Sequence, residues 1–226
     1  LERLSSGLRI NRAADDAAGL AVAEGFRSVV RGAVVAQRNA QDGINLVQTA
    51  DGALGETTNI LQRIRELAVQ SANGTQSDIN RAALDAEVQQ LLEQIDNIAL
   101  DTEFNGLRVL SQSTTVTLQV GAQASQTINV AVAAGKTNDL NVDGLSISNM
   151  TLATSTLSTI DLALRSVTTL RSRLGATQNR LEFTISTLAI QEENSAASES
   201  AIRDADIARE TIGFTRNQIL VSAGTS

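Results

Sequence analysis

Apolar residues recur at alternating steps of three and four positions in two long stretches, one near each end of the chain. The stretch nearer the C-terminus holds Leu157, Ile160, Leu164, Val167, Arg171, Leu174, Gln178, Leu181, Ile185 and Leu188. The stretch nearer the N-terminus holds Val47, Ala50, Leu54, Thr57, Leu61, Ile64 and Ala68. Such heptad spacing places one apolar stripe on a helix, and the stripe needs a partner helix to cover it. The pattern predicts a mainly α fold, in which the two ends of the chain form a long antiparallel helical coiled-coil rod.

Two polar residues, Arg171 and Gln178, occupy positions within the C-terminal stripe. One interpretation is that they lie where the helix drifts away from its partner and are partly exposed. The other, which we favour, is that they fix the register and the choice of partner, as a single polar residue does in the core of a coiled coil.

The sequence pattern predicts two helices before residue 103, one that contains the first stripe and a second one after it. A helical pattern runs over 17–72, and because its six glycines lower helix propensity we expect a break before Gly43. An Asn-Gly pair ends this helix, and Ser77 or Asp78 begins the next one. The tight connection predicts that the second helix lies antiparallel to the first.

The apolar period shortens to two after about Ser111. Apolar residues alternate with polar ones on both sides of a Gly-containing loop at 121–126, which predicts a β-hairpin. These apolar residues are Val116, Leu118, Val120, Ile128, Val130 and Val132. The helical pattern returns over 157–193, and we expect a break across the small polar residues 194–200 before a last helix at about 202–221.

These patterns divide the chain into three segments. Residues 1–110 form the N-terminal part of a helical rod domain, 111–155 form the β-hairpin and a short variable insert, and 156–226 form the C-terminal part of the rod domain. Two ends folded together around a distinct centre indicate assembly rather than catalysis.

The composition excludes most catalytic chemistry. The chain has no His and no Cys, which removes imidazole bases, thiol nucleophiles and most zinc sites. We expect no cofactor and no enzymatic activity. A net charge of -7 without a basic cluster disfavours nucleic-acid binding, and the apolar runs are too short to span a membrane.

Two pairs of carboxylates, Asp15 with Asp16 and Asp204 with Asp206, could in principle hold Mg²⁺ or Ca²⁺. Neither pair lies in a Gly-turn calcium loop, and no third ligand is obvious. We therefore interpret them as helix caps or solvated helix surface.

A second apolar edge, formed by Ile60 and Leu67, lies at the segment LQRIRELAVQSAN (61–73) and the residue before it. An apolar residue on an outward edge, flanked by Arg63, is suited to binding a partner. The alternative, which we favour by pattern alone, is that a third helix covers this edge.

Several segments closely resemble bacterial flagellins. On the N-terminal side they are LERLSSGLRINRAADDAAGLAVAEGF at 1–26, LVQTADGAL at 46–54, LQRIRELAVQSANGTQSD at 61–78 and EFNGLRVL at 103–110. On the C-terminal side they are LRSRLGATQNRLEFTI at 170–185, SAIRDADIARE at 200–210 and NQILVSAGTS at 217–226. The resemblance covers about 1–110 and 155–226 in the family's order, so it is highly specific.

The resemblance implies a secreted structural subunit of the bacterial flagellum. Many copies of a flagellin polymerise into the extracellular filament that serves motility, with the terminal helices in the tube wall and the central insert outside. In the family the hairpin region takes part in switching between filament forms, which would place residues 114–132 near subunit contacts.

Flagellins normally have residues before LERLSSGLR and an apolar helix after AGTS, and this sequence lacks both. We therefore expect this fragment to be soluble and to polymerise poorly. The family's export chaperone binds mainly at the C-terminal end, so it is a possible partner whose site is mostly absent from this sequence.

The resemblance also implies recognition by the vertebrate flagellin-sensing Toll-like receptor, which binds the LQRxREL segment and the facing short helix of many flagellins. Carried over by motif, Arg63 is the anchoring cation, Leu67 the apolar contact and Glu87 the carboxylate beside them. Gln62 and Gln90 are their neighbours. Because these motif residues are present, the resemblance implies that this chain is recognised.

Two other classes of protein are compatible with parts of the pattern. A chemoreceptor-like helical hairpin shares the richness in Ala, Gln and Glu, but it would lack the alternating centre and the glycines at 43, 52 and 55. An enzyme in the insert is the other alternative, because some flagellins carry a zinc protease there. That enzyme needs HExxH, and a chain without His excludes it.

Overall fold

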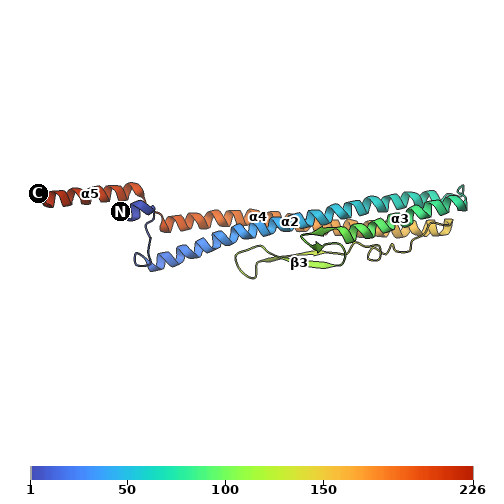
Figure 1. The fold of residues 1–226 in the computed structure, drawn as a ribbon, viewed down its shortest axis with the longest axis horizontal. Coiled ribbons are helices and arrows are strands. Elements are labelled where there is room, and N and C mark those ends of the chain that lie inside the picture. Colours follow the sequence, from blue (N-terminus) through green and yellow to red (C-terminus); the bar gives the residue numbers. More distant parts are fainter. Residues whose placement is uncertain (1, 226) are drawn as a thin grey trace. The chain divides into compact units, whose positions relative to one another are not determined.

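The computed structural model describes residues 2–225 and is mainly helical (Figure 1). The helices are α1 (Glu2–Ser6), α2 (Ala17–Ala72), α3 (Asp78–Asp101), α4 (Met150–Arg203) and α5 (Ile207–Thr225). The strands are β1 (Glu103–Phe104), β2 (Leu107–Arg108), β3 (Thr114–Gln119) and β4 (Thr127–Val132). The predicted fold class, long helices from both ends of the chain with a small β element between them, is confirmed.

The chain forms two compact units, and each draws on several parts of the sequence. The first unit contains Leu1–Asn39, Gln119–Gln126 and Thr184–Ser226. The second unit contains Ala40–Leu118 and Thr127–Phe183. The helices α2 and α4 contribute residues to both units.

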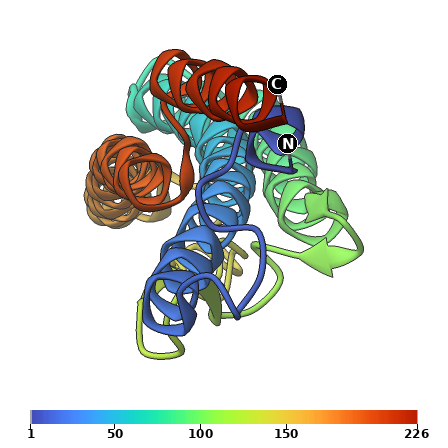
Figure 2. The same ribbon diagram turned by 90° about the vertical axis from the view of Figure 1, so that its left-hand side faces the viewer.

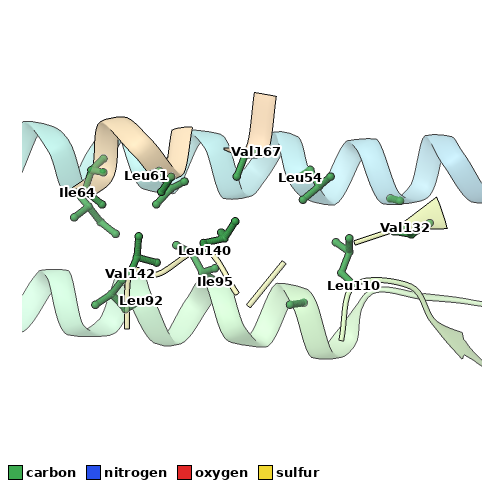
Figure 3. Close-up of a cluster of buried hydrophobic side chains, with 14 of the residues drawn as sticks. Leu54, Leu61, Ile64, Leu92, Ile95, Leu110, Val132, Leu140, Val142 and Val167 are labelled. Atoms are coloured by element: carbon green, nitrogen blue, oxygen red, sulfur yellow. The ribbon is translucent and has the colours of Figure 1, made fainter. Parts of the chain in front are cut away.

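The second unit holds the main core. Here α2, α3 and α4 lie side by side (Figure 1), and the loop after β4 closes the space between α2 and α3. Figure 3 shows Leu140 and Val142 of that loop between Leu61 on α2 and Leu92 on α3. These four side chains are buried. Burying a side chain of this size stabilises the fold by about 1.5–3 kcal/mol, so an aliphatic core without tryptophan or tyrosine is sufficient to hold three helices together.

Ion pairs in the second unit show that α2 and α4 are antiparallel. Arg65 contacts Asp161, and Asp51 contacts Arg171, both at 2.8 Å. Residues later in α2 therefore lie beside residues earlier in α4.

The first unit repeats this pairing with a smaller core. Gln37 donates a hydrogen bond to Glu192, and Arg203 contacts Glu24 at 3.2 Å, so the two helices are antiparallel here as well. One buried apolar cluster of this unit consists of Ala33, Ala36 and Leu188. At the chain ends α1 lies beside α5 (Figure 2), and Arg3 pairs with Glu210.

Two small hairpins follow α3. The first, β1–β2, turns through Asn105 and Gly106, which both have positive φ, as a tight two-residue hairpin turn requires. This hairpin is not among the elements predicted from the sequence. The second, β3–β4, is the predicted β-hairpin, and alternate β4 residues are buried. Thr117 of β3 donates a hydrogen bond to Asn129 of β4.

The break expected before Gly43 is absent, because α2 is continuous from Ala17 to Ala72. A Cβ atom at Gly43 would lie 2.2 Å from Cδ1 of Leu118 and 3.2 Å from Cδ1 of Leu181. The glycine therefore gives β3 and α4 room to approach α2, and packing compensates for its poor helix propensity.

The break expected at 194–200 is also wrong. This segment is helical, and α4 continues to Arg203 before the chain turns at 204–206. The hydroxyl of Ser198 donates to the carbonyl oxygen of Asn194 one turn earlier, so small polar residues are accommodated within the helix. At its other end α4 begins at Met150, seven residues before the predicted start, because Asn149 caps it and accepts from the Leu152 N–H.

Candidate functional site

Three of the four paired aspartates accept hydrogen bonds from backbone N–H groups, and the fourth accepts one from a side chain. Asp16 precedes α2 and accepts a hydrogen bond from the Gly19 N–H, and Asp206 precedes α5 and accepts from the Arg209 N–H. Asp204 accepts from the hydroxyl of Ser200. Within residues 2–225 no group of three or more His, Cys, Asp or Glu side chains could hold a metal ion.

Asp15 closes the turn before α2. Its carboxylate accepts hydrogen bonds from the N–H groups of Arg12 and Asn11, at 3.0 and 3.1 Å. These two bonds favour the charged form, and they lower the pKa of Asp15 below its ordinary value.

Most of the predicted seam residues are buried. The buried ones are Leu54, Leu61, Ile64, Val167, Leu174, Leu181 and Leu188. Leu164 is half-buried, and its neighbour Ala163 is buried in its place. A straight helix drifts by about 20° per heptad relative to a strict 3.5-residue repeat, which accounts for the change from one position to the next.

The two polar seam residues have different partners. Arg171 donates two hydrogen bonds to Asp51 of α2, from Nε and Nη2 at 2.8 and 3.2 Å. This fork raises the pKa of Arg171, chiefly through the hydrogen bond to Asp51. Gln178 instead donates to Glu182 on its own helix. Of the two, Arg171 therefore links α4 to α2 through its hydrogen bonds to Asp51.

The face formed by α2 and α3 carries a cluster of exposed charges. Arg63 donates to Glu87 of α3 from Nε and Nη2, at 3.1 and 2.9 Å, and from Nη1 to Glu66 at 3.2 Å. The side chains of Arg63 and Glu87 remain 52% and 43% exposed. The hydrogen bond to Glu87 is the main reason that the pKa of Arg63 is raised. A guanidinium has five N–H donors, so part of this one stays available to a partner.

The other residues that the resemblance pointed to lie on or under this face. Gln62 and Gln90 are exposed on α2 and α3. Leu67 is buried, with 1% of its surface exposed, and belongs to the same core cluster as Val88 of α3. Of the two interpretations of this edge, an outward apolar surface is therefore contradicted at Leu67, and the favoured one, in which the edge is covered, agrees with its burial. Ile60 is half-buried.

Sequence reasoning missed the side chains that fasten the loop after β4 to α3. Asp96 accepts hydrogen bonds from the N–H and the hydroxyl of Thr137, and Asp85 accepts from the Ile147 N–H. Gln89 donates to the carbonyl oxygen of Leu145. These contacts hold the strap, defined as residues 133–149, over the core. The spacing of Asp85, Gln89 and Asp96 on one helix face was the available signal.

Family models match both ends of the chain. The model described as the bacterial flagellin N-terminal helical region matches residues 1–115, and the one described as the bacterial flagellin C-terminal helical region matches residues 157–226. This chain belongs to the bacterial flagellin family. Both matches fall on the helical segments that the resemblance had identified.

Curated flagellins match almost the full chain. A flagellin of Halalkalibacterium halodurans is 49% identical over 226 residues, covering 99% of this chain and 83% of the relative. Flagellin FlaB1 of Treponema pallidum is 42% identical, covering 100% of this chain and 85% of the relative. A flagellin of Bacillus subtilis is also 42% identical, covering 99% of this chain and 85% of the relative.

Solved structures agree. The crystal structure of Bacillus cereus flagellin has a TM-score of 0.60 and 33% identity, covering 67% of this chain and 88% of that one. A putative flagellar hook-associated protein from Vibrio parahaemolyticus has a TM-score of 0.70, covering 84% of this chain and 100% of that one. Its identity of 12% extends the likeness to the fold alone.

Membership of the flagellin family establishes a structural role. The chain is a structural subunit of the flagellar filament, a homopolymer in the extracellular part of the flagellum, and not an enzyme. Within the part of the chain that the structure describes, no helix is long and apolar enough to cross a membrane.

Proposed function

We propose that this filament subunit is secreted and that its α2–α3 face is bound by the vertebrate flagellin-sensing Toll-like receptor. The observation that carries this proposal is the exposed ion pair between Arg63 and Glu87. Arg63 belongs to the LQRxREL segment, and Glu87 to the facing helix, by which the receptor binds many flagellins. In the proposed organisation, 1–110 and 156–226 together supply the filament wall, and 111–155 supply the outer insert.

Arg63 is suited to be the centre of the receptor contact. The two carboxylates that flank it, Glu66 and Glu87, hold its guanidinium in one orientation while half of the side chain stays in solvent. A preorganised arginine loses less conformational entropy on binding, and arginines are frequent among residues that dominate interfaces. Gln62 and Gln90 extend the polar surface on either side.

Leu67 supports this surface from below. Because its side chain is buried, it does not meet the receptor as an exposed apolar contact. It belongs to the core cluster that also contains Val88 of α3, and this core holds the two helices, and so Arg63 and Glu87, at their present separation. A change at Leu67 would therefore weaken binding through the geometry of the pair.

A receptor reporter assay on Arg63→Ala tests the proposal. We expect the potency to fall about 30-fold, which corresponds to the loss of about 2 kcal/mol typical of a dominant interface residue. Arg65→Ala is the matched control, since Arg65 lies on the same helix, is similarly exposed and pairs with Asp161 of α4 instead. It should keep the potency of the unchanged chain.

An exposed ion pair contributes little to folding, so circular dichroism should give the same helix content for both variants. Unchanged potency for Arg63→Ala, or equal losses for both variants, would exclude Arg63 as the anchor. Glu87→Gln should show a smaller loss than Arg63→Ala, because it removes the charge that orients the guanidinium and leaves the arginine in place.

Export by the dedicated flagellin chaperone is a second candidate interaction. In the family this chaperone meets the C-terminal end, and α5 of this chain has no buried residue among those that the structure describes. Calorimetric titration of the chain with a flagellin chaperone would measure this contact. Ile219→Asp should weaken it, because Ile219 is 61% exposed on α5.

A further inference from the structure

An open groove between α2 and α3 carries only negative charge. It has a volume of about 360 Å³ and is lined by Gly52, Ala53, Glu56, Gln94, Asn97, Ile98, Asp101 and Thr102. Glu56 and Asp101 are exposed, and the amide side chains of Gln94 and Asn97 also line the groove. A Cβ atom at Gly52 would meet nothing within 4 Å, so the floor has room for an incoming side chain.

The α4 face of the same unit carries arginines without partners. Arg165 and Arg173 are exposed, and within residues 2–225 neither guanidinium has a hydrogen-bond or ion-pair partner. Eight residues of helix separate them, which corresponds to about 12 Å. They flank a groove of about 500 Å³ whose other lining residues include Ser113, Leu162 and one carboxylate, Asp139.

These two surfaces differ in charge and share no residue. The acidic groove is built from α2 and α3, and the arginine face from α4, the start of the hairpin segment and the strap. We propose that they are the two halves of a head-to-tail contact, in which the arginine face of one copy docks on the acidic groove of the next copy. The inference rests on the homopolymeric function of the family.

The proposed occupant is a second copy because this chain carries both complementary halves. A self-complementary patch closes into a dimer, whereas two different complementary patches on one chain allow open-ended growth, as a filament requires. An arginine fork matches a carboxylate in geometry as well as charge. Within residues 2–225, neither the carboxylates of the groove nor the two arginines of the arginine face form an ion pair. Like charges would repel if two acidic grooves or two arginine faces met, which fixes the orientation.

Disulfide trapping tests this contact directly, because the chain has no cysteine. Asp101→Cys and Arg173→Cys are made separately as full chains, mixed at high concentration and oxidised. We expect mixed dimers of the two variants at least about ten times faster than dimers of either variant with itself. Ala86→Cys replaces Asp101→Cys in the matched control, since Ala86 is exposed on α3 outside the groove.

Each outcome of the trapping experiment decides between occupants. Mixed dimers that form no faster than with Ala86→Cys overturn the head-to-tail contact. Preferential Asp101→Cys self-dimers would also overturn it, because they indicate that two grooves face each other. Electron microscopy of the unchanged protein tests filament formation separately. Filaments without mixed dimers would thus reject this contact and leave the family function intact.

Charge reversal gives a second, independent readout. Asp101→Arg or Arg173→Asp alone should weaken concentration-dependent self-association in sedimentation, because each juxtaposes like charges. A mixture of the two variants should recover it, since every copy then finds an opposite charge on its neighbour. Equal weakening in the mixture would overturn the pairing of these two residues. Added salt should weaken the association of the unchanged chain.

Discussion

At the scale of single residues, adjacent positions of α2 have opposite roles. Leu61 and Ile64 are fully buried, whereas Arg63 between them is half-exposed and holds two carboxylates. The helical period explains the difference, because a step of two residues turns the side chain by about 200°. Binding and folding therefore depend on different members of one short segment and can be altered separately.

Leu61→Ala should destabilise the fold strongly. Its side chain has no exposed surface, and replacing it with alanine leaves a cavity in the main core. We expect a loss of about 2–5 kcal/mol in the free energy of unfolding. Urea unfolding followed by far-ultraviolet circular dichroism is suitable, because the chain has no tryptophan. Ile79→Ala, at a residue 83% exposed, should change the unfolding free energy little, and equal losses would contradict the core assignment.

Asp15 should make a stabilising contribution that acid removes. Its pKa is lowered in the folded chain by the N–H groups of Arg12 and Asn11. The contribution is complete above the unfolded pKa of about 3.9 and is lost as the pH falls through the folded pKa. Asp15→Asn should therefore be less stable than the unchanged chain at pH 7, and the difference should shrink below about pH 4. A difference that grows with acid would refute this assignment.

At the scale of elements, glycines decide where the second hairpin meets α2. In the first unit a Cβ atom at Gly32 would lie 2.7 Å from Cβ and 3.2 Å from Cα of Ala122, in the loop between β3 and β4. In the second unit Gly43 makes comparable room for Leu118. The backbone contact at Gly32 is the less tolerant of the two, because a side-chain tip can move more easily than a main chain.

Gly32→Ala should release the loop at 120–126 from α2. Alanine favours the helix by about 1 kcal/mol, but the clash with Ala122 opposes that gain. Hydrogen exchange should become faster in the loop and stay unchanged in α2. Gly25→Ala is the matched control, since its Cβ atom would meet nothing within 4 Å, and it should stabilise the chain without affecting the loop. Unchanged exchange in the loop of Gly32→Ala would contradict the contact.

The elements also show what the sequence can predict. The stripe through Leu54 and Leu61, the helix start at Ser77 and the alternation of β4 are local patterns, and each corresponds to a feature of the structure. The continuity of α2 through Gly43 depends on what packs there, which no local propensity records. The strap was beyond reach for the same reason, because its partners Asp85 and Asp96 lie 62 and 41 residues away.

The sequence identified part of the candidate site and missed the features that depend on how the helices pack. Arg63 and Glu87 were identified by motif, and the structure brings them within 2.9 Å across 24 residues of sequence. The burial of Leu67 could not be derived from its own helix, because it depends on where α3 lies. The acidic groove likewise combines residues of two helices, so neither helix alone indicates it.

At the scale of the whole molecule, the two units differ in how much apolar surface they bury. Among the described residues, the first unit buries few apolar side chains, such as Ile10, Ala23 and the cluster of Ala33, Ala36 and Leu188. The second unit's core draws on all three helices, the hairpin and the strap. Local stability follows the density of buried apolar contacts. Each unit should therefore open with its own free energy.

Hydrogen exchange should separate the two units. Amides of α2 within 17–39 and of α4 within 184–203 should exchange faster than those within 46–68 and 153–174, because fewer buried side chains hold them. Leu188→Ala should widen the difference and leave the second unit unaffected. Uniform protection along α2 and α4 would contradict the division.

Because residues of α2 pair with residues of α4 that are far away in the sequence, a delay separates the synthesis of the two partners. Gln37 must wait for Glu192, which is made 155 residues later. At 5–20 residues per second, this interval lasts about 8–30 s, far longer than a helix needs to form. Arg9 waits longer still for the carbonyl oxygen of Ile202. During that interval the first unit of a new chain lacks its α4 partner, so its N-terminal part has no tertiary contact with α4 until residues 192–202 have been made.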